Sequence, residues 1–160
     1  MKKRVFCLFF AILMLFSVTL VACKEEEPEA PKFVPPPFDP NAVVGTPDLP
    51  NAEELGYSEL DARGVYQFSV CGAINVVEGK ADVWLTNPAK NNVWLKVRVY
   101  NKQTGAILGE TGLIKPGEYV QTLTFTSAPE KGTELALRIM SYEPETYYSR
   151  GEVTLNTYAS

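Results

Sequence analysis

The chain of 160 residues contains no histidine. This absence excludes Ser-His-Asp and Cys-His triads in their usual form, zinc ligation by imidazole, and acid–base catalysis by histidine. The sequence also lacks a Gly-x-Ser-x-Gly nucleophile motif, a phosphate-binding loop, a dinucleotide-binding fingerprint and an EF-hand loop. We therefore expect no catalytic residues, no metal ligands and no cofactor, and the sequence predicts a protein that is not an enzyme.

Cysteine is scarce, with only Cys7, Cys23 and Cys71. Cys7 and Cys23 lie in or at the end of an apolar N-terminal run, so Cys71 stands alone in the rest of the chain and no intrachain disulfide is expected there. A nucleophilic role for Cys71 would need a base, a cation or a helix N-terminus to lower its pKa. Its position in Phe68-Ser69-Val70-Cys71-Gly72 instead favours a small buried hydrophobic residue in a strand.

Carboxylates offer one alternative route to catalysis. Glu143 and Glu145 lie in a tyrosine-rich stretch, and glycosidases use two carboxylates about 5 to 10 Å apart. Carboxylates two positions apart are also common on solvated loops, and small β-domains rarely form a deep cleft. The solvated loop is the favoured interpretation.

The first 23 residues read as a secretory signal. Lys2, Lys3 and Arg4 precede an apolar run, Val5 to Leu20. The ending Leu20-Val21-Ala22-Cys23 resembles a bacterial lipobox. This resemblance implies cleavage before Cys23, a diacylglycerol thioether on its thiol and an added N-acyl chain. The alternative is an uncleaved membrane anchor, because about 18 apolar residues approach a span, but the small residue Ala22 before Cys23 favours processing.

Lipid on Cys23 would place the chain in the cell envelope, facing outward. In a one-membrane bacterium the anchor would be the plasma membrane. In a two-membrane bacterium Lys24 departs from the usual acidic inner-membrane retention signal, which points to the outer membrane. Cleavage would also lower the formal net charge from −4 to −7, because Lys2, Lys3 and Arg4 are removed. An acidic chain argues against binding to nucleic acid or to anionic membrane surfaces.

Three segments are expected: a signal peptide at residues 1–22, a lipid-anchored tether rich in proline and glutamate at 23–56, and a folded domain at 57–160. Eight of the twelve prolines lie between Pro28 and Pro50. Proline fixes φ and removes N–H donors, so we expect the tether to be disordered and extended. At about 3.1 Å per residue, roughly thirty residues would reach about 100 Å. A proline-rich docking ligand for an aromatic groove is the alternative.

The segment from residue 57 onward alternates with the period of a β-strand. Between Val93 and Tyr100 the odd positions are all aliphatic and the even positions are aromatic or cationic, as in a half-buried strand. Turn signals such as Lys115-Pro116-Gly117-Glu118 separate several such runs. The pattern predicts an all-β fold, a single antiparallel β-sandwich of about seven or eight strands. Over residues 64–158 it resembles the immunoglobulin-like and fibronectin type III-like domains of bacterial surfaces, a resemblance that implies no activity.

Aromatic side chains are the best candidates for binding. Trp84, Trp94 and Tyr100 fall opposite the aliphatic stripes, with Lys96 and Arg98 between them. Such residues dominate the energetics of protein interfaces, although cross-strand aromatic and cation pairs also stabilise ordinary sheets. We expect a non-catalytic interaction, adhesion or scaffolding module that binds another envelope protein, with Trp84, Trp94 and Tyr100 in one patch. The alternative is a carbohydrate-binding module, with coplanar aromatics flanked by Asn91, Asn92 or Asp82.

Replacing the predicted lipid-bearing cysteine tests the anchor. Cys23→Ser removes the thiol that would carry the lipid, so an unprocessed precursor is expected to accumulate. The measurement is the mass of the purified protein together with its partition into a detergent phase. A Cys23→Ser chain that still matured and entered the detergent phase would contradict the lipoprotein hypothesis, and Cys7→Ser is the matched control.

Overall fold

A computed structural model describes residues 33–160 of the chain. The predicted signal peptide, the predicted lipidation site Cys23 and residues 24–32 of the predicted tether lie outside the described residues. Within the described part, no helix is long and apolar enough to cross a membrane. Residues Pro35–Ser160 form one compact unit.

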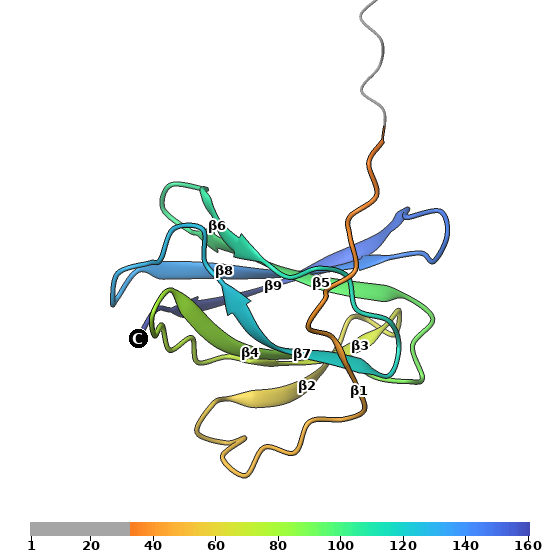
Figure 1. Cartoon of the computed structure of the whole chain (residues 1–160), viewed down its shortest axis with the longest axis horizontal. Helices are drawn as coiled ribbons and strands as arrows, with labels where there is room; N and C mark the ends of the chain where they lie inside the picture. The colour runs from red at the N-terminus through yellow and green to blue at the C-terminus, as the bar shows by residue number, and fades with distance from the viewer. Residues whose placement is uncertain (1–32) are drawn as a thin grey trace, which may run out of the picture. The chain divides into compact units, whose positions relative to one another are not determined.

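This unit is an antiparallel β-sandwich, as the sequence predicts (Figure 1). One sheet has five strands in the order β1-β7-β4-β3-β2, and the other has four in the order β6-β5-β8-β9. The first sheet contains β1 (Val43–Val44), β2 (Tyr57–Asp61), β3 (Gln67–Cys71), β4 (Lys80–Asn87) and β7 (Glu118–Thr124). The second contains β5 (Trp94–Asn101), β6 (Ile107–Glu110), β8 (Glu134–Tyr142) and β9 (Ser149–Tyr158).

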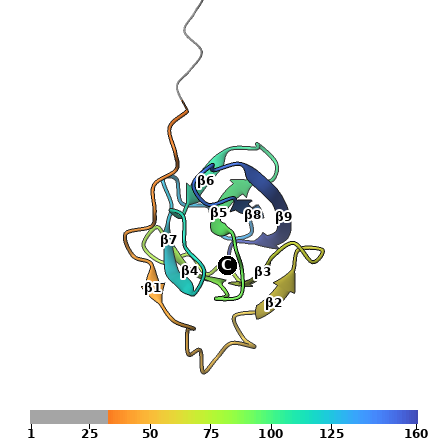
Figure 2. The same cartoon turned by 90° about the vertical axis from the view of Figure 1, so that its right-hand side faces the viewer.

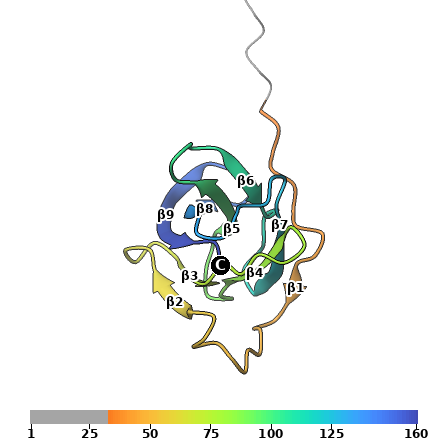
Figure 3. The same ribbon diagram turned by 90° about the vertical axis from the view of Figure 1, so that its left-hand side faces the viewer.

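The connections cross repeatedly between the two layers, which are seen end-on in Figures 2 and 3. β4 leads to β5, β6 to β7 and β7 to β8, each time from one sheet to the other. Strands β3, β4 and β7 are neighbours in the first sheet, and β5, β8 and β9 are neighbours in the second. The two further strands of the first sheet, β1 and β2, and the edge strand β6 of the second bring the count in residues 33–160 to nine.

The core is formed by the aliphatic faces of the two sheets. On β5 the side chains of Leu95, Val97 and Val99 are fully buried, and Leu135, Leu137 and Ile139 on the adjacent β8 are equally buried. The five-stranded sheet contributes Phe68, Val70, Val83 and Leu85. Burial of each such side chain stabilises the fold by about 1.5 to 3 kcal/mol. The period-two pattern of the sequence therefore correctly predicts which side chains of these strands face the core.

The predicted boundary at residue 56 is wrong, because the folded unit begins about twenty residues earlier. Residues 37–45, here called the strap, pack against the sandwich. Leu113 donates to the Pro37 carbonyl and Asp39 donates to the Leu113 carbonyl, both at 2.9 Å. Further along the strap, β1 pairs with β7, where Val43 lies opposite Tyr119. Proline removes donors only at its own positions, so the residues between the prolines can still pair with an unsatisfied strand edge.

A close backbone contact fixes the strap. The carboxylate oxygen Oδ2 of Asp39 accepts a hydrogen bond from Gly112 N–H at 2.8 Å. A Cβ atom on Gly112 would lie 2.7 Å from the carbonyl carbon of Phe38, so glycine is required there. Lys115 Nζ lies 4.7 Å from the centre of the Phe38 ring on the same segment. These contacts make the strap part of the folded unit.

Candidate functional site

The candidate binding residues do not form one patch. Trp84 lies on β4 in the five-stranded sheet, whereas Trp94, Lys96, Arg98 and Tyr100 lie on β5 in the other sheet. The predicted joint patch of Trp84, Trp94 and Tyr100 is therefore wrong. The cause is the β4–β5 connection, which crosses the sandwich between Asn87 and Trp94. Alternation along a strand correctly predicts which of its side chains face outward. It does not predict which of the two sheets the strand belongs to.

On the four-stranded sheet, alternate residues of β5 and β8 face outward. They form a layer, here called the outer layer, composed of Trp94, Lys96, Arg98 and Tyr100 on β5 and Arg138, Met140 and Tyr142 on β8. Lys96 lies opposite Met140 and Arg98 opposite Arg138. Because two arginines face each other, carboxylates are needed nearby to balance their charge.

Trp94 is a packing residue in this layer. Its ring meets Phe38 of the strap edge-on, with the ring centres 4.8 Å apart, and meets Tyr147 of the β8–β9 loop in the same way at 5.1 Å. Edge-to-face pairs of this kind contribute about 0.5 to 1.5 kcal/mol each beyond the area they bury. Trp94 thus joins the strap and the β8–β9 loop to the sheet rather than offering a free face.

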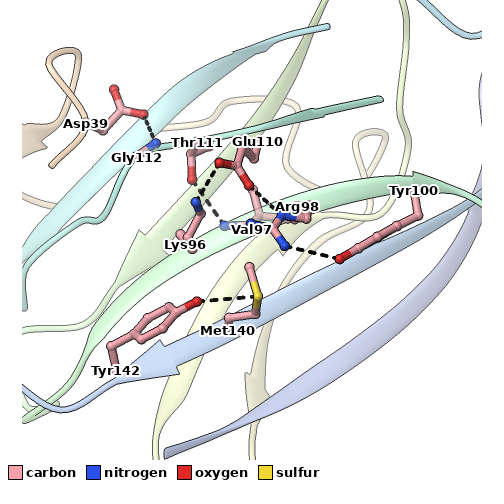
Figure 4. Close-up of polar contacts among 10 residues, drawn as sticks. All are labelled: Asp39, Lys96, Val97, Arg98, Tyr100, Glu110, Thr111, Gly112, Met140 and Tyr142. Carbon is pink, nitrogen blue, oxygen red and sulfur yellow. Dashed lines mark hydrogen bonds and ion pairs between the residues drawn. The ribbon is translucent and has the colours of Figure 1, made fainter. Parts of the chain in front are cut away.

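Lys96, one of the candidate binding residues, is buried. Its side chain is 2% exposed, and its Nζ lies 2.9 Å from Oε1 of Glu110. The second carboxylate oxygen of Glu110 pairs with Arg98 Nε, so one carboxylate bridges two cations (Figure 4). Glu110 lies on β6 opposite Arg98, and sequence analysis missed it because β6 is short and carries no clear alternation.

The ionisation of Glu110 reflects these neighbours. Burial acts to raise the pKa of its carboxyl group, but hydrogen bonds and charge from Lys96 and Arg98 outweigh burial and hold that pKa below its ordinary value of 4.5. The carboxylate is therefore charged at neutral pH, as the two cations require.

Tyr100 and Arg138 complete the layer. Arg98 Nη1 donates to the Tyr100 hydroxyl at 3.3 Å, and the Arg138 guanidinium lies 4.5 Å from the centre of the Tyr100 ring. Arg138 also lies 3.9 Å from Glu152 on β9. Beside them the Tyr142 hydroxyl lies 3.6 Å from the Met140 sulfur (Figure 4). The aromatic and cationic side chains of the layer are therefore held in place by one another.

Trp84 occupies a separate site on the five-stranded sheet. The register of β4 shifts between Asp82 and Leu85, and Trp84 has a φ of 46°, which is unusual for a bulky residue. This β-bulge brings its ring to 5.8 Å from that of Tyr119, with 26° between the ring planes. Asp82 accepts from the Thr122 hydroxyl at 2.8 Å and from the Gln121 amide at 3.3 Å.

The remaining candidates have structural roles. The Asn91 side-chain amide donates to the Asn87 side chain at 2.7 Å and accepts from Gln67 N–H at 3.0 Å. It therefore links the β4–β5 connection to strands β4 and β3. Burial, reinforced by the charge of Asp82, raises the pKa of the Cys71 thiol to about 11, and a protonated buried thiol is not a nucleophile. Glu143 accepts from Thr146 within its own loop at 2.9 Å. In the described part of the chain, no three side chains of metal-binding type gather together.

Removing the carboxylate between the two cations tests the outer layer. Glu110→Gln leaves the buried Lys96 ammonium unpaired, so we expect a loss of about 1 to 3 kcal/mol in the free energy of unfolding, measured with urea at pH 7. Adding Lys96→Met to Glu110→Gln is expected to restore most of it. The folded-state pKa of Glu110 is lowered, so its contribution is present above the ordinary pKa of 4.5 and is lost as pH falls through the folded value. Equal stability of parent and Glu110→Gln at pH 7 would contradict this account.

The structure thus brings four of the five candidate residues together in one layer, adds Glu110, Arg138 and Tyr142 to it, and separates Trp84 from it. Comparison of the chain with models of protein families finds no match, and comparison with curated proteins finds none either.

Proposed function

We propose that this chain is a lipid-anchored, non-catalytic interaction module of the bacterial envelope, and that it binds a partner protein through the outer layer of its four-stranded sheet. The lipid on Cys23 would fix its position, and the segment before the strap would set its reach. The sandwich then presents the layer as a scaffold or adhesion surface.

The observation that carries this proposal is the preorganisation of Arg98, Tyr100, Arg138 and Tyr142. Tyrosine, tryptophan and arginine are the residues most enriched where truncation weakens protein complexes most. Binding normally costs about 0.5 to 1.5 kcal/mol for each flexible side chain that becomes ordered. Here the ion pairs and the cation–aromatic contact have already ordered these side chains. A partner would therefore meet a surface that needs little rearrangement.

The charge of the layer indicates the kind of partner. Lys96, Arg98 and Arg138 carry three positive charges against the two negative charges of Glu110 and Glu152. The whole chain has a formal net charge of −4, so this face differs in sign from the molecule. An acidic patch on a partner protein fits this face, because complementary potentials steer association and fix orientation.

Carbohydrate binding is the second candidate, and one observation favours it on the opposite sheet. Trp84 and Tyr119 are stacked beside the polar side chains of Asp82, Gln121 and Thr122. Aromatic side chains with a few polar groups beside them are typical of ligand-binding sites, and here a sugar ring could stack on the aromatic pair and hydrogen-bond to the carboxylate and amide. The two candidate functions therefore use different sheets and can be separated by mutation.

Affinity capture distinguishes these functions. The full chain in detergent is immobilised and exposed to solubilised envelope from its own organism. Captured proteins are identified by mass spectrometry and polysaccharide by sugar analysis. We expect a protein that is enriched by the parent and falls at least tenfold with Tyr100→Ala/Arg138→Ala, because both side chains belong to the outer layer.

The matched control is Trp84→Ala/Tyr119→Ala, which removes an aromatic pair from the other sheet and should leave capture of that protein unchanged. Melting temperatures of both variants check that the fold persists. Polysaccharide that is captured by the parent and lost only with the control would support carbohydrate binding instead. A partner protein that tolerates Tyr100→Ala/Arg138→Ala would contradict the proposed face.

A further inference from the structure

Strand β9 is the longest outer strand of the described sandwich. It has ten residues and is the last strand of the four-stranded sheet. The other outer strands have two, five and four residues, and β6, at the opposite edge of the same sheet, is bridged where Gly109 pairs with Phe125. Long unpaired edges attract further strands, and proteins usually block them with lysine, proline or a covering segment. Between Ser149 and Tyr158 there is no lysine and no proline.

The backbone groups of β9 alternate between the sheet and its free side. Ala159 donates to the Thr133 carbonyl at 3.0 Å, which is toward β8, whereas Ser160 donates away from β8 to the Ile74 carbonyl. Continuing this alternation back along the strand turns the N–H and C=O groups of Glu152, Thr154 and Asn156 away from β8. The Ile74–Ala159 bridge covers only the C-terminal end of the strand. A free stretch of edge therefore runs from residue 152 to residue 156.

A groove follows this free edge. One wall is formed by residues 150–154 of β9, and the other by residues 61–66, which include the end of β2 and the loop that leads to β3. The groove has a volume of about 550 Å³. Ala62, Val65 and Val153 give it an apolar part, and Val65 is 47% exposed although it is a large aliphatic residue. A strand lying along β9 could therefore place alternate side chains against this apolar surface.

The carboxylates around the groove have partners within the described residues, whereas its two arginines make no ion pair there. The Asp61 carboxylate accepts from Gln67 Nε2 at 3.1 Å and from Gly64 N–H, and the Glu152 carboxylate lies 3.9 Å from Arg138. Within residues 33–160, neither Arg63 nor Arg150 makes an ion pair. Arg63 is also held at a φ of 54°, in a conformation that few residues other than glycine adopt. The groove therefore offers two free guanidinium groups and no free carboxylate of its own.

We propose that the β9 edge is a peptide-binding site, to which an extended segment of a partner protein adds as a fifth strand of the four-stranded sheet. Backbone hydrogen bonds to Glu152, Thr154 and Asn156 provide the affinity, as in other strand-addition complexes. Aliphatic side chains of the segment pack on Val65 and Val153, and acidic side chains pair with Arg63 and Arg150. This site does not depend on the outer layer.

A second copy of the chain fits this site less well. Its β9 would bring a single acidic residue, Glu152, which already lies beside Arg138. The occupant that matches both the apolar part and the free arginines is a separate acidic, aliphatic strand.

Selection from a random peptide library tests this proposal without assuming a sequence. Twelve-residue peptides displayed on phage are selected on the full chain in detergent, and the enriched peptides are synthesised and titrated by fluorescence polarisation. We expect alternating aliphatic and acidic residues. Thr154→Pro should weaken binding at least tenfold, because it removes an N–H that points away from β8 and so leaves the β8–β9 pairing intact. Circular dichroism and the melting temperature check that pairing.

Charge reversal provides a second, independent variant. Arg63→Glu/Arg150→Glu should also weaken the same peptides at least tenfold, whereas Lys80→Glu/Lys131→Glu makes the same charge change away from Arg63 and Arg150 and should leave affinity within about twofold. Peptides that tolerate both Thr154→Pro and Arg63→Glu/Arg150→Glu, or a library that yields no enriched peptide, would overturn the proposal. Dimerisation of the free chain that Thr154→Pro abolishes, seen by light scattering, would also overturn it by assigning the edge to a second copy.

Discussion

The burial of one side of β5 is the constraint on which the rest of this molecule depends. Leu95, Val97 and Val99 are fully buried in the core between the sheets, where their apolar side chains are removed from water. Their alternation obliges Trp94, Lys96, Arg98 and Tyr100 to face outward. Three of these four side chains are polar or cationic, and the strand geometry of β5 directs all four away from the core. The outer layer of ion pairs and aromatic contacts is therefore a consequence of how the core is built.

The two proposed binding surfaces follow from the same sheet. Its outer face is ordered by contacts among its own side chains, with Glu110 between Lys96 and Arg98. Its edge at β9 differs from this ordered face. Along residues 152–156 the backbone there has hydrogen-bonding groups that no neighbouring strand pairs. The strap covers β7 at an edge of the five-stranded sheet, whereas β9 is the long outer strand of the four-stranded sheet in the described part. Face and edge are distinct surfaces and can be occupied independently.

The sequence predicts the fold well because period-two alternation is a local property. It identifies the buried faces of β5 and β8 and the all-β class. It fails where long-range pairing decides the outcome. The sheet membership of Trp84 depends on a crossing between sheets, the burial of Lys96 depends on Glu110 across the sheet, and the strap depends on a glycine, Gly112, that lies more than seventy residues from Asp39. None of these pairings leaves a periodic signal. The free edge of β9 is likewise visible only when all strand partners are known.

The central claim is that the strap is docked and the β9 edge is open, so that one sheet presents both a rigid face and a free edge. Residue-resolved amide hydrogen exchange by NMR on the free chain tests this directly. The account predicts slow exchange at Asp39, Gly112 and Leu113, and an alternation along β9 in which Val153 and Leu155 exchange slowly while Glu152, Thr154 and Asn156 exchange fast. Uniform protection from residue 152 to 156 would show that the edge is already paired, and fast exchange at Asp39 and Leu113 would show that the strap is not docked. Either result would contradict the account.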